Sequence, residues 1–368
     1  MSTKTDRIKH YFAGGNTGEG FYSFYDQIMG PDANRLYLLK GGPGSGKSTF
    51  MREIGQVMLA HGFELEYFHC SSDPNSLDGV AIPALKIGLI DGTAPHTMDP
   101  VNPGVVDEII NLGAFLDETP LTTAKKKIME TAAKKKSCFE RAYVYLAAAK
   151  GVYHHWETTN HARLASESWL PIYLRLREEI FGQQKPSGKL GTLRRLFASA
   201  ITPDGPVNYL ESLFGGARKI YALEGPPGSG QSFILERLVA TTQEYGLSGE
   251  VYHCALDPKR IEHLYLPKLK IGVVTSHWPH QFCLEQNCEL IDTSSFIKQH
   301  SHLSQETVKE ARLVFLDLLE RSINWLQKAR TLHIELEKHY STSMDWQRSA
   351  ELRDEIIRNL LRTYHGEG

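Results

Sequence analysis

The sequence predicts an α/β protein made of two copies of one domain, each with a parallel sheet and a long helical appendage. Two similar glycine-rich loops, GGPGSGKS starting at Gly41 and GPPGSGQS starting at Gly225, lie in the two halves of the chain. A short apolar segment precedes each loop, and a segment with apolar residues at helical spacing follows it. Strand–helix–strand order of this kind is typical of parallel sheets.

The repeat extends over most of the chain. The dipeptide His-Cys begins at His69 and again at His253, and LKIG begins at Leu85 and again at Leu269. Both pairs have the same separation as the two loops, so the alignment needs no gap here. We infer duplication of a unit of roughly 180 residues, a typical domain size. A segment rich in Gly and polar residues, 182–191, separates the copies. The expected domains are therefore 1–186 and 187–368.

Each copy has the same predicted order of elements. The predicted strands are 35–40, 64–70 and 85–91 in the first copy and 219–224, 250–254 and 269–275 in the second. The predicted helices after the two loops are 48–62 and 232–246. The rest of each copy, about 103–181 and about 285–363, carries apolar residues at helical spacing and is predicted to form the helical appendage.

Composition excludes several classes of protein. Among 368 residues, 41 basic and 43 acidic side chains leave a net charge of −2, so a nucleic-acid partner is not expected. The hydrophobic fraction of 41% argues against disorder. No apolar run is long enough to span a bilayer, and the start of the chain does not resemble a secretory signal. Five sparse cysteines predict reduced thiols and a cytoplasmic location.

The first loop matches the Walker A pattern, G-x4-G-K-S, between a predicted strand and a predicted helix. Its glycines let successive backbone N–H groups point at phosphate oxygens, and the helix N-terminus adds partial positive charge. Lys47 is expected to reach the β- and γ-phosphates of a nucleoside triphosphate, and the hydroxyl of Ser48 to ligate Mg²⁺. The predicted nucleotide-binding residues are Gly42, Pro43, Gly44, Ser45, Gly46, Lys47, Ser48 and Thr49, with Thr49 the weaker metal candidate.

The second loop differs at the residue that matters most for this chemistry. Gln231 replaces the lysine, so a neutral amide stands where an ammonium would meet the phosphates. Charge-assisted hydrogen bonds are roughly twice as strong as neutral ones. We therefore expect the second loop to hold a phosphate at most weakly and not to support turnover.

Asp91 is the Walker B candidate, because it ends an apolar strand where ligands bind in open α/β sheets. It is predicted to bind Mg²⁺ with Ser48 and to act in catalysis with Lys47. The alternative is a turn-forming aspartate, because Gly92 follows it. The second copy has Thr275 at this position, so the half that lost the lysine also lost the carboxylate.

No glutamate follows Asp91, unlike the pair that many hydrolytic ATPases use to activate water. Asp73 or His96 could act instead, although Asp73 is better explained as a turn or cap residue beside Pro74. His69, Cys70 and His96 all recur in the second copy. Their retention there favours a structural or interface role over catalysis or a metal site.

Two lysine runs, Lys125–Lys127 and Lys134–Lys136, lie in the first appendage. The simplest interpretation is a solvated helix face, and the alternative is a surface for an acidic partner or nucleic acid. The aromatic residues that follow are expected to pack in the appendage core: Tyr143, Tyr145, Tyr153 and Trp156.

The strings LKGGPGSGKSTF, HCSSDPNSLDG and LKIGLIDGTAPHTMDP resemble a bacterial family of tandem P-loop NTPases, ATPase or nucleotide kinase-like, whose second P-loop is degenerate. The resemblance covers the full chain. It implies two duplicated P-loop NTPase cores and ATP (or GTP) with Mg²⁺ as cofactors. It also implies the superfamily roles for Lys47, Ser48 and Asp91, while Gln231 and Thr275 depart from the pattern.

Three functions follow as hypotheses. The first is an ATPase with one active site in the first copy and a regulatory or structural second copy. The second is a kinase that transfers the γ-phosphoryl group to a small molecule or nucleotide, with Arg141 and Arg163 as candidate phosphate clamps. The third is a non-catalytic, nucleotide-gated protein that binds a protein partner through its helical appendages.

Overall fold

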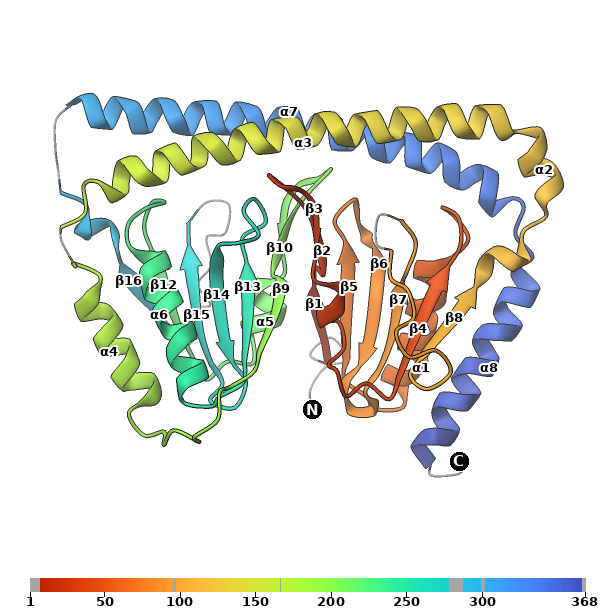
Figure 1. The fold of residues 1–368 in the computed structure, drawn as a ribbon, viewed down its shortest axis with the longest axis horizontal. Helices are drawn as coiled ribbons and strands as arrows, with labels where there is room; N and C mark the ends of the chain where they lie inside the picture. Colours follow the sequence, from red (N-terminus) through yellow and green to blue (C-terminus); the bar gives the residue numbers. More distant parts are fainter. Residues whose placement is uncertain (1–6, 95–96, 166, 278–286, 299–301, 366–368) are drawn as a thin grey trace.

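The computed structural model describes residues 7–94, 97–165, 167–277, 287–298 and 302–365. The chain forms a mixed α/β protein with two six-stranded sheets side by side below two long helices (Figure 1). In spatial order, the first sheet contains β1 (Ile8–Tyr11), β5 (Leu65–Cys70), β6 (Asp73–Ile82), β7 (Ile87–Asp91), β4 (Arg35–Lys40) and β8 (Asp107–Asn111). The second contains β9 (Leu193–Phe197), β13 (Gly249–His253), β14 (Ile261–Leu266), β15 (Ile271–Ser276), β12 (Lys219–Glu224) and β16 (Cys288–Asp292). Equivalent strands therefore follow the same order in both sheets.

The sheets are mixed, which corrects the prediction of purely parallel sheets. β6 pairs antiparallel with both β5 and β7, and β14 does the same with β13 and β15. The other pairs are parallel. β6 and β14 were not predicted. β6 begins with the polar and turn-forming residues DPNS, and β14 is a short segment interrupted by Glu262 and His263.

The boundaries of the helical appendages were also predicted too wide. β8 and β16 lie within the segments expected to be helical, and each is an edge strand beside the strand that leads into a glycine-rich loop. The helices of the first half are α1 (Lys47–Ala60), α2 (Glu118–Thr123), α3 (Lys125–His161) and α4 (Leu170–Phe181). Those of the second half are α5 (Leu210–Phe214), α6 (Gln231–Glu244), α7 (His302–Ser341) and α8 (Trp346–His365).

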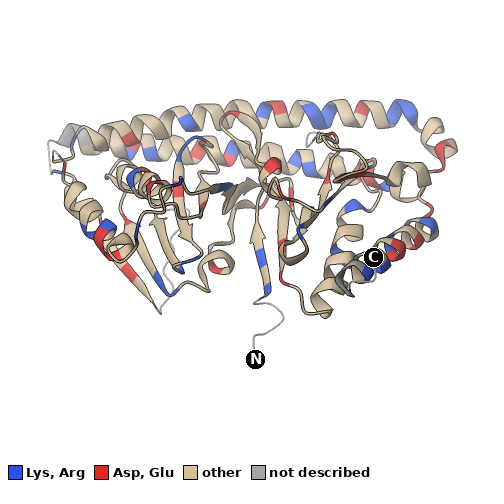
Figure 2. Cartoon of the chain, turned by 60° about the horizontal axis from the view of Figure 1, so that its bottom comes forward, with Lys and Arg blue, Asp and Glu red and all other residues tan. Residues whose placement is uncertain are grey.

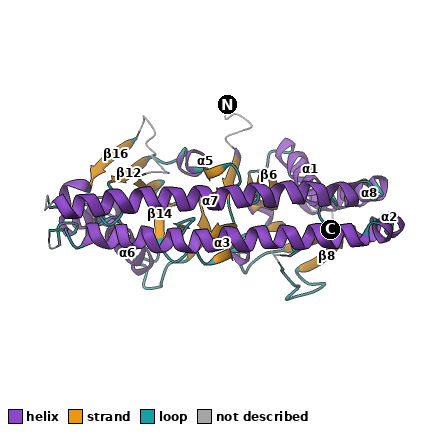
Figure 3. Cartoon of the chain, turned by 90° about the horizontal axis from the view of Figure 1, so that it is seen from above, coloured by secondary structure: helices purple, strands orange, loops and turns teal. Residues whose placement is uncertain are grey.

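α3 and α7 run antiparallel and cross above both sheets (Figures 1 and 3). α3 has 37 residues and α7 has 40, so each is about 55–60 Å long at 1.5 Å per residue. Their buried residues recur at alternating spacings of four and three, which is the seam of an antiparallel coiled coil. The seam residues are Ala142, Leu146, Ala149 and Tyr153 on α3 and Phe315, Leu319, Ser322, Leu326 and Ala329 on α7. Basic and acidic residues are interspersed along both helices (Figure 2).

The crossing places each appendage against the sheet of the other half. Ile356 and Leu360 of α8 belong to the hydrophobic cluster around α1, which covers the first sheet. Leu176 and Ile180 of α4 belong to the equivalent cluster around α6 in the second half. The division at 182–191 therefore separates the sheets but not the packing units, because each half contributes helices to the other.

The two sheets also join directly between their edge strands β1 and β9. Phe12 and Phe197 exchange two backbone hydrogen bonds of 3.0 Å, and both side chains are fully buried. The hairpins β2 (Gly14–Thr17)/β3 (Gly20–Ser23) and β10 (Ser199–Thr202)/β11 (Gly205–Asn208) flank this junction. Within the described residues, no helix is both long and apolar enough to cross a lipid bilayer.

Candidate active site at the first glycine-rich loop

The first glycine-rich loop connects the end of β4 to the start of α1, as the sequence predicts. Gly44 and Gly46 have φ angles of 73° and 82°, and the equivalent Gly228 and Gly230 have φ angles of 79° and 97°. Only glycine adopts this left-handed region without strain. The two loops therefore keep the same backbone curl, although their side chains differ.

Lys47 and Asp91 meet at the first loop. The Nζ atom of Lys47 lies 2.9 Å and 3.0 Å from the carbonyl oxygens of Gly41 and Gly42, and 3.6 Å from Oδ2 of Asp91. β7, which ends at Asp91, pairs in parallel with β4, so both strands deliver their carboxyl ends to the same edge. Oδ1 of Asp91 accepts a hydrogen bond of 2.8 Å from the backbone N–H of Thr93.

The oxygen donors near this edge suit Mg²⁺. The Ser48 hydroxyl oxygen accepts a 2.8 Å hydrogen bond from the backbone N–H of Leu77, which fixes its position at the start of α1. Thr49 is exposed. Among the described residues, no group of three His, Cys, Asp or Glu side chains could hold a metal ion alone. Mg²⁺ commonly binds through one carboxylate together with nucleotide phosphates and water, so Ser48 and Asp91 fit such a site.

The second loop keeps the frame of the site without its charges. The Nε2 atom of Gln231 donates hydrogen bonds of 3.0 Å and 3.1 Å to the carbonyl oxygens of Leu223 and Gly225, much as Lys47 does in the first loop. Gln231 and Thr275 are both buried. The second loop therefore has a neutral amide and a hydroxyl where the first has an ammonium and a carboxylate.

The crossing helices cover both loops with equivalent residues. A Cβ atom on Gly44 would lie 2.5 Å from the carbonyl oxygen of Glu337 in α7, and a Cβ on Gly228 would likewise meet the carbonyl oxygen of Glu157 in α3. Trp346 lies against Gly46. Trp169 lies against Gly230 in the same way. Each loop is thus in contact with a long helix of the opposite half.

Three side chains of the helix pair face the first loop, and sequence reasoning missed them. Nζ of Lys135 lies 3.2 Å from Nδ1 of His333, and Nε2 of His333 lies 3.5 Å from Oε1 of Glu337. Burial, aided by Lys135 and Lys47, lowers the pKa of His333 to about 4, so its imidazole is neutral near pH 7. Burial also lowers the pKa of Lys135 and raises that of Glu337.

Lys135 corrects the interpretation of the lysine runs as a solvated face. Five of the six lysines are exposed, but Lys135 is half-buried. It lies two helical turns before the seam residue Ala142, and His333 lies two turns after the seam residue Leu326. The heptad spacing from the seam therefore indicates that Lys135 and His333 are on the inner side of the helix pair, which the composition of the lysine runs does not show.

Asp73 forms the turn that the sequence favours. Its carboxylate accepts hydrogen bonds from the hydroxyl of Ser76, at 2.7 Å, and from the backbone N–H of Asn75, at 3.3 Å. Its charge still reaches the helix pair, because it raises the pKa of Glu337. His96 and its counterpart His280 lie outside the described residues.

His69 lies at the junction of the two sheets, where it serves packing. Its Nε2 atom is 2.8 Å from Nδ1 of His10, and its ring lies 4.5 Å from that of Tyr209 in the second half. His253 is placed similarly, 3.0 Å from a guanidinium nitrogen of Arg195 and 4.9 Å from the ring of Phe24. The retention of both histidines is explained by this interface.

The two candidate phosphate clamps have other partners. The guanidinium of Arg141 lies 4.7 Å from the ring centre of Trp325 on α7. Arg163, just after the end of α3, donates hydrogen bonds to Asn160 and to the carbonyl oxygen of Lys298. Both contacts tie the helical layer together, and neither involves the first loop.

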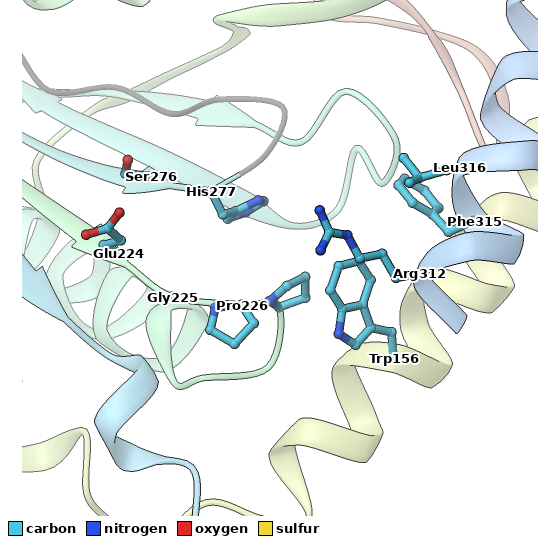
Figure 4. A pocket seen from close by; sticks show the side chains of 10 residues that line it. Trp156, Glu224, Gly225, Pro226, Ser276, His277, Arg312, Phe315 and Leu316 are labelled. Atoms are coloured by element: carbon cyan, nitrogen blue, oxygen red, sulfur yellow. The ribbon is translucent and has the colours of Figure 1, made fainter. Parts of the chain in front are cut away.

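A cavity of about 260 Å³ lies beside the second loop, between Pro226 and α7. Arg312 points into it from α7, on the side where His277 lies, and Trp156 closes it from α3 (Figure 4). The dipeptide Glu-Arg at 140–141 and again at 320–321 aligns the two long helices, and Ala132 is then the counterpart of Arg312. The surroundings of the two loops have therefore diverged as much as the loops themselves.

Comparison with known proteins adds no relative to this geometry. No protein-family model, no curated protein and no solved structure matches the chain.

Proposed function

We propose that the protein is an ATP-binding, Mg²⁺-dependent P-loop NTPase with one active site, at the first glycine-rich loop. In this proposal the two sheets with their loops are duplicated P-loop NTPase cores. The second core has a regulatory or structural role. The observation that carries the proposal is the convergence of Lys47 and Asp91, 3.6 Å apart at the carboxyl edge of two paired parallel strands.

The two halves support this proposal by their contrast. The loop backbone is the same in both, so its glycines alone do not distinguish them. The second half lacks both the lysine and the aspartate of the first. Joint loss of the two charges is expected if both serve one reaction.

The roles of the residues follow from their charges and positions. The backbone N–H groups of the first loop and the start of α1 would hold the phosphates, and Lys47 would neutralise charge on the β- and γ-phosphates. Ser48 and Asp91 would hold Mg²⁺, which when bound neutralises charge on the phosphate oxygens. α7 and α8, which contact the loop through Glu337 and Trp346, would exclude water from one side of the site.

The kinase hypothesis retains one observation in its favour. Gly92 follows Asp91, so β7 supplies no second carboxylate to activate water. The acceptor would then be a small molecule rather than water.

Phosphorus NMR of the full-length protein with Mg-ATP separates these functions. Inorganic phosphate that forms without an acceptor, and fails to form in Lys47→Ala, would support the ATPase. A new phosphoester that needs a pool of nucleosides and metabolites would indicate a kinase. Binding without turnover would leave a nucleotide-gated interaction protein. Gln231→Ala is the matched control, and equal loss of activity in both variants would contradict a single active site.

A further inference from the structure

Lys135, His333 and Glu337 form a chain of polar contacts that ends at the first loop. Because His333 is neutral, its Nδ1 accepts from the Lys135 ammonium at 3.2 Å and its Nε2–H is directed at Glu337, 3.5 Å away. Glu337 is held at the loop by the contact of its own carbonyl with Gly44. An ammonium has three donors, so the contact with His333 leaves two of them for another acceptor.

The second half shows what these positions contain where the loop has lost its charges. In the same alignment of the long helices on their Glu-Arg dipeptides, Phe315 replaces Lys135 and Tyr153 replaces His333. Their rings are in edge-to-face contact, with centres 5.4 Å apart. The polar pair Lys135–His333 of the first site is therefore replaced by an aromatic pair at the equivalent positions of the second.

The third position is a glutamate in both halves, but its carboxylate has a different partner in each. Glu157 takes the place of Glu337 and lies 3.4 Å from the guanidinium of Arg260. That guanidinium also lies 4.6 Å from the ring centre of Tyr153 and 3.0 Å from Glu262. The carboxylate over the second loop is thus part of a closed ion-pair network.

We propose that Lys135 is a second phosphate-binding lysine, which contacts the terminal phosphate of a nucleoside triphosphate at the first loop. His333 and Glu337 are positioning residues that hold its ammonium over the loop. This inference rests on the proposed function, because it requires a triphosphate at Lys47.

The charges around Lys135 are consistent with this role. Lys47 and Lys135 act on each other electrostatically, and both act on His333 and Glu337. The carboxylates of Asp73 and Asp91, on strands of the first sheet, act electrostatically on His333 in the opposite direction. Two ammonium groups that act on the same side chains favour a strongly anionic group such as a γ-phosphate, which a nucleoside diphosphate does not have.

The test compares binding of a non-hydrolysable ATP analogue with binding of ADP, both with Mg²⁺, to the full-length protein. Lys135→Met is expected to weaken binding of the ATP analogue roughly 10- to 100-fold, as expected for loss of one charge-assisted hydrogen bond, and to change ADP binding less than about two-fold. Lys134→Met and Lys136→Met are matched controls, since both lysines are exposed on the same helix. They are expected to leave both affinities unchanged.

Two further variants test whether the preference for the triphosphate depends on the charge at position 135 and on the histidine at position 333. Lys135→Arg is expected to keep the preference for the triphosphate, because it keeps the charge. His333→Tyr, which introduces the residue found in the second half, is expected to lower that preference. If Lys135→Met folds poorly by circular dichroism, Lys135→Gln keeps a donor toward His333 and answers the same question.

The outcomes are distinct. If the wild-type protein binds both nucleotides and Lys135→Met keeps the wild-type ratio of affinities, the role of Lys135 is wrong and the proposed function stands. If the wild-type protein binds neither nucleotide, the proposed function fails and this inference fails with it.

Discussion

Glu337 and Glu157 hold the same position over the two glycine-rich loops, each reaching across from the opposite half of the chain. The carbonyl oxygen of Glu337 lies at Gly44, and that of Glu157 lies at Gly228. Their carboxylates differ in partner, because Glu337 lies 3.5 Å from neutral His333 and Glu157 lies 3.4 Å from Arg260. The same backbone contact thus supports two different electrostatic environments.

The first prediction concerns the contact between loop and helix. Gly44→Ala puts an alanine at a φ of 73°, in the left-handed region. Its Cβ would also lie 2.5 Å from the carbonyl oxygen of Glu337, which the α7 backbone holds in place. We expect a loss of stability of about 1–3 kcal/mol. Gly228→Ala, which has the same conformation and the same kind of neighbour, is expected to cost a similar amount in thermal unfolding.

The two glycine variants should differ in nucleotide binding. Gly44→Ala is expected to weaken ATP binding, whereas Gly228→Ala is expected to leave it within about two-fold of the wild-type value. Calorimetric titration would check this. Equal weakening by both substitutions would show that the loops act as one site.

Asp91 is expected to determine the Mg²⁺ requirement. Asp91→Asn keeps the size of the side chain and the acceptor for Thr93, but it removes the negative charge. Turnover should fall by about 10²-fold or more, and the Mg²⁺ concentration for half-maximal activity should rise. Thr275→Val is the control in the second half. An unchanged Mg²⁺ titration in Asp91→Asn would assign the metal to other ligands.

Arg194 is expected to stabilise the junction of the two sheets. Its guanidinium donates to both carboxylate oxygens of Glu66, at 2.8 Å and 2.7 Å, and to the carbonyl oxygens of Gln27 and Ile28. Arg194→Met removes these four hydrogen bonds, and the long 3.4 Å contact from the Tyr11 hydroxyl to Glu66 does not replace them. The free energy of unfolding should therefore fall by about 2–4 kcal/mol.

The counterpart of the Arg194–Glu66 ion pair joins β1 of the first sheet to β13 of the second and provides the comparison. Lys9 and Glu250 are 3.9 Å apart, and the Lys9 side chain is 40% exposed. Lys9→Met should therefore cost about 1 kcal/mol or less in the same urea unfolding experiment. If Lys9→Met lowered the free energy of unfolding more than Arg194→Met does, the stabilising role assigned to Arg194 would be contradicted.

Buried histidines should make the fold sensitive to mild acid. Burial lowers the pKa of His69 and of His253 from 6.5 to about 4. Between these values the unfolded chain binds a proton that the folded protein does not, so stability falls as pH decreases from about 6.5 to about 4. The stability that these neutral histidines support is fully present above about pH 6.5.

The matching measurement is urea unfolding at about pH 7 and about pH 5.5. His69→Gln removes one of the titrating groups, so its loss of stability between the two pH values should be smaller than that of the wild-type protein. His61→Gln is the control, because His61 lies on the exposed surface. An identical pH dependence in wild type and His69→Gln would exclude His69 as the source.

The sequence predicted the parts of the fold that local pattern determines. β4 and β12 have the predicted bounds, because each is a short apolar segment directly before a glycine-rich loop. The nearness of Asp91 to Lys47 also followed, since parallel strands deliver their carboxyl ends to one edge. Tyr153 is buried in the helical layer, as expected.

What the sequence did not reveal depends on tertiary contacts. β6 begins with DPNS, and its strand conformation comes from its place between β5 and β7. Lys135 looks like its neighbours in a run of three lysines, and only the phase of the coiled-coil seam turns it toward the loop. The exchange of helices between halves leaves no local signal, because α4 and α8 would be equally amphipathic on either sheet.

The crossing of α3 and α7 suggests how the chain arose. A single ancestral unit would have lacked the helix that contacts its own loop, so it would have worked as a homodimer with exchanged arms and two identical sites. Joining two such units in one gene preserves that arrangement and removes the requirement that both sites stay the same. One loop could then keep Lys47 and Asp91 while the other changed to Gln231 and Thr275. Two identical subunits could not differ in this way, whereas two halves joined in one chain could.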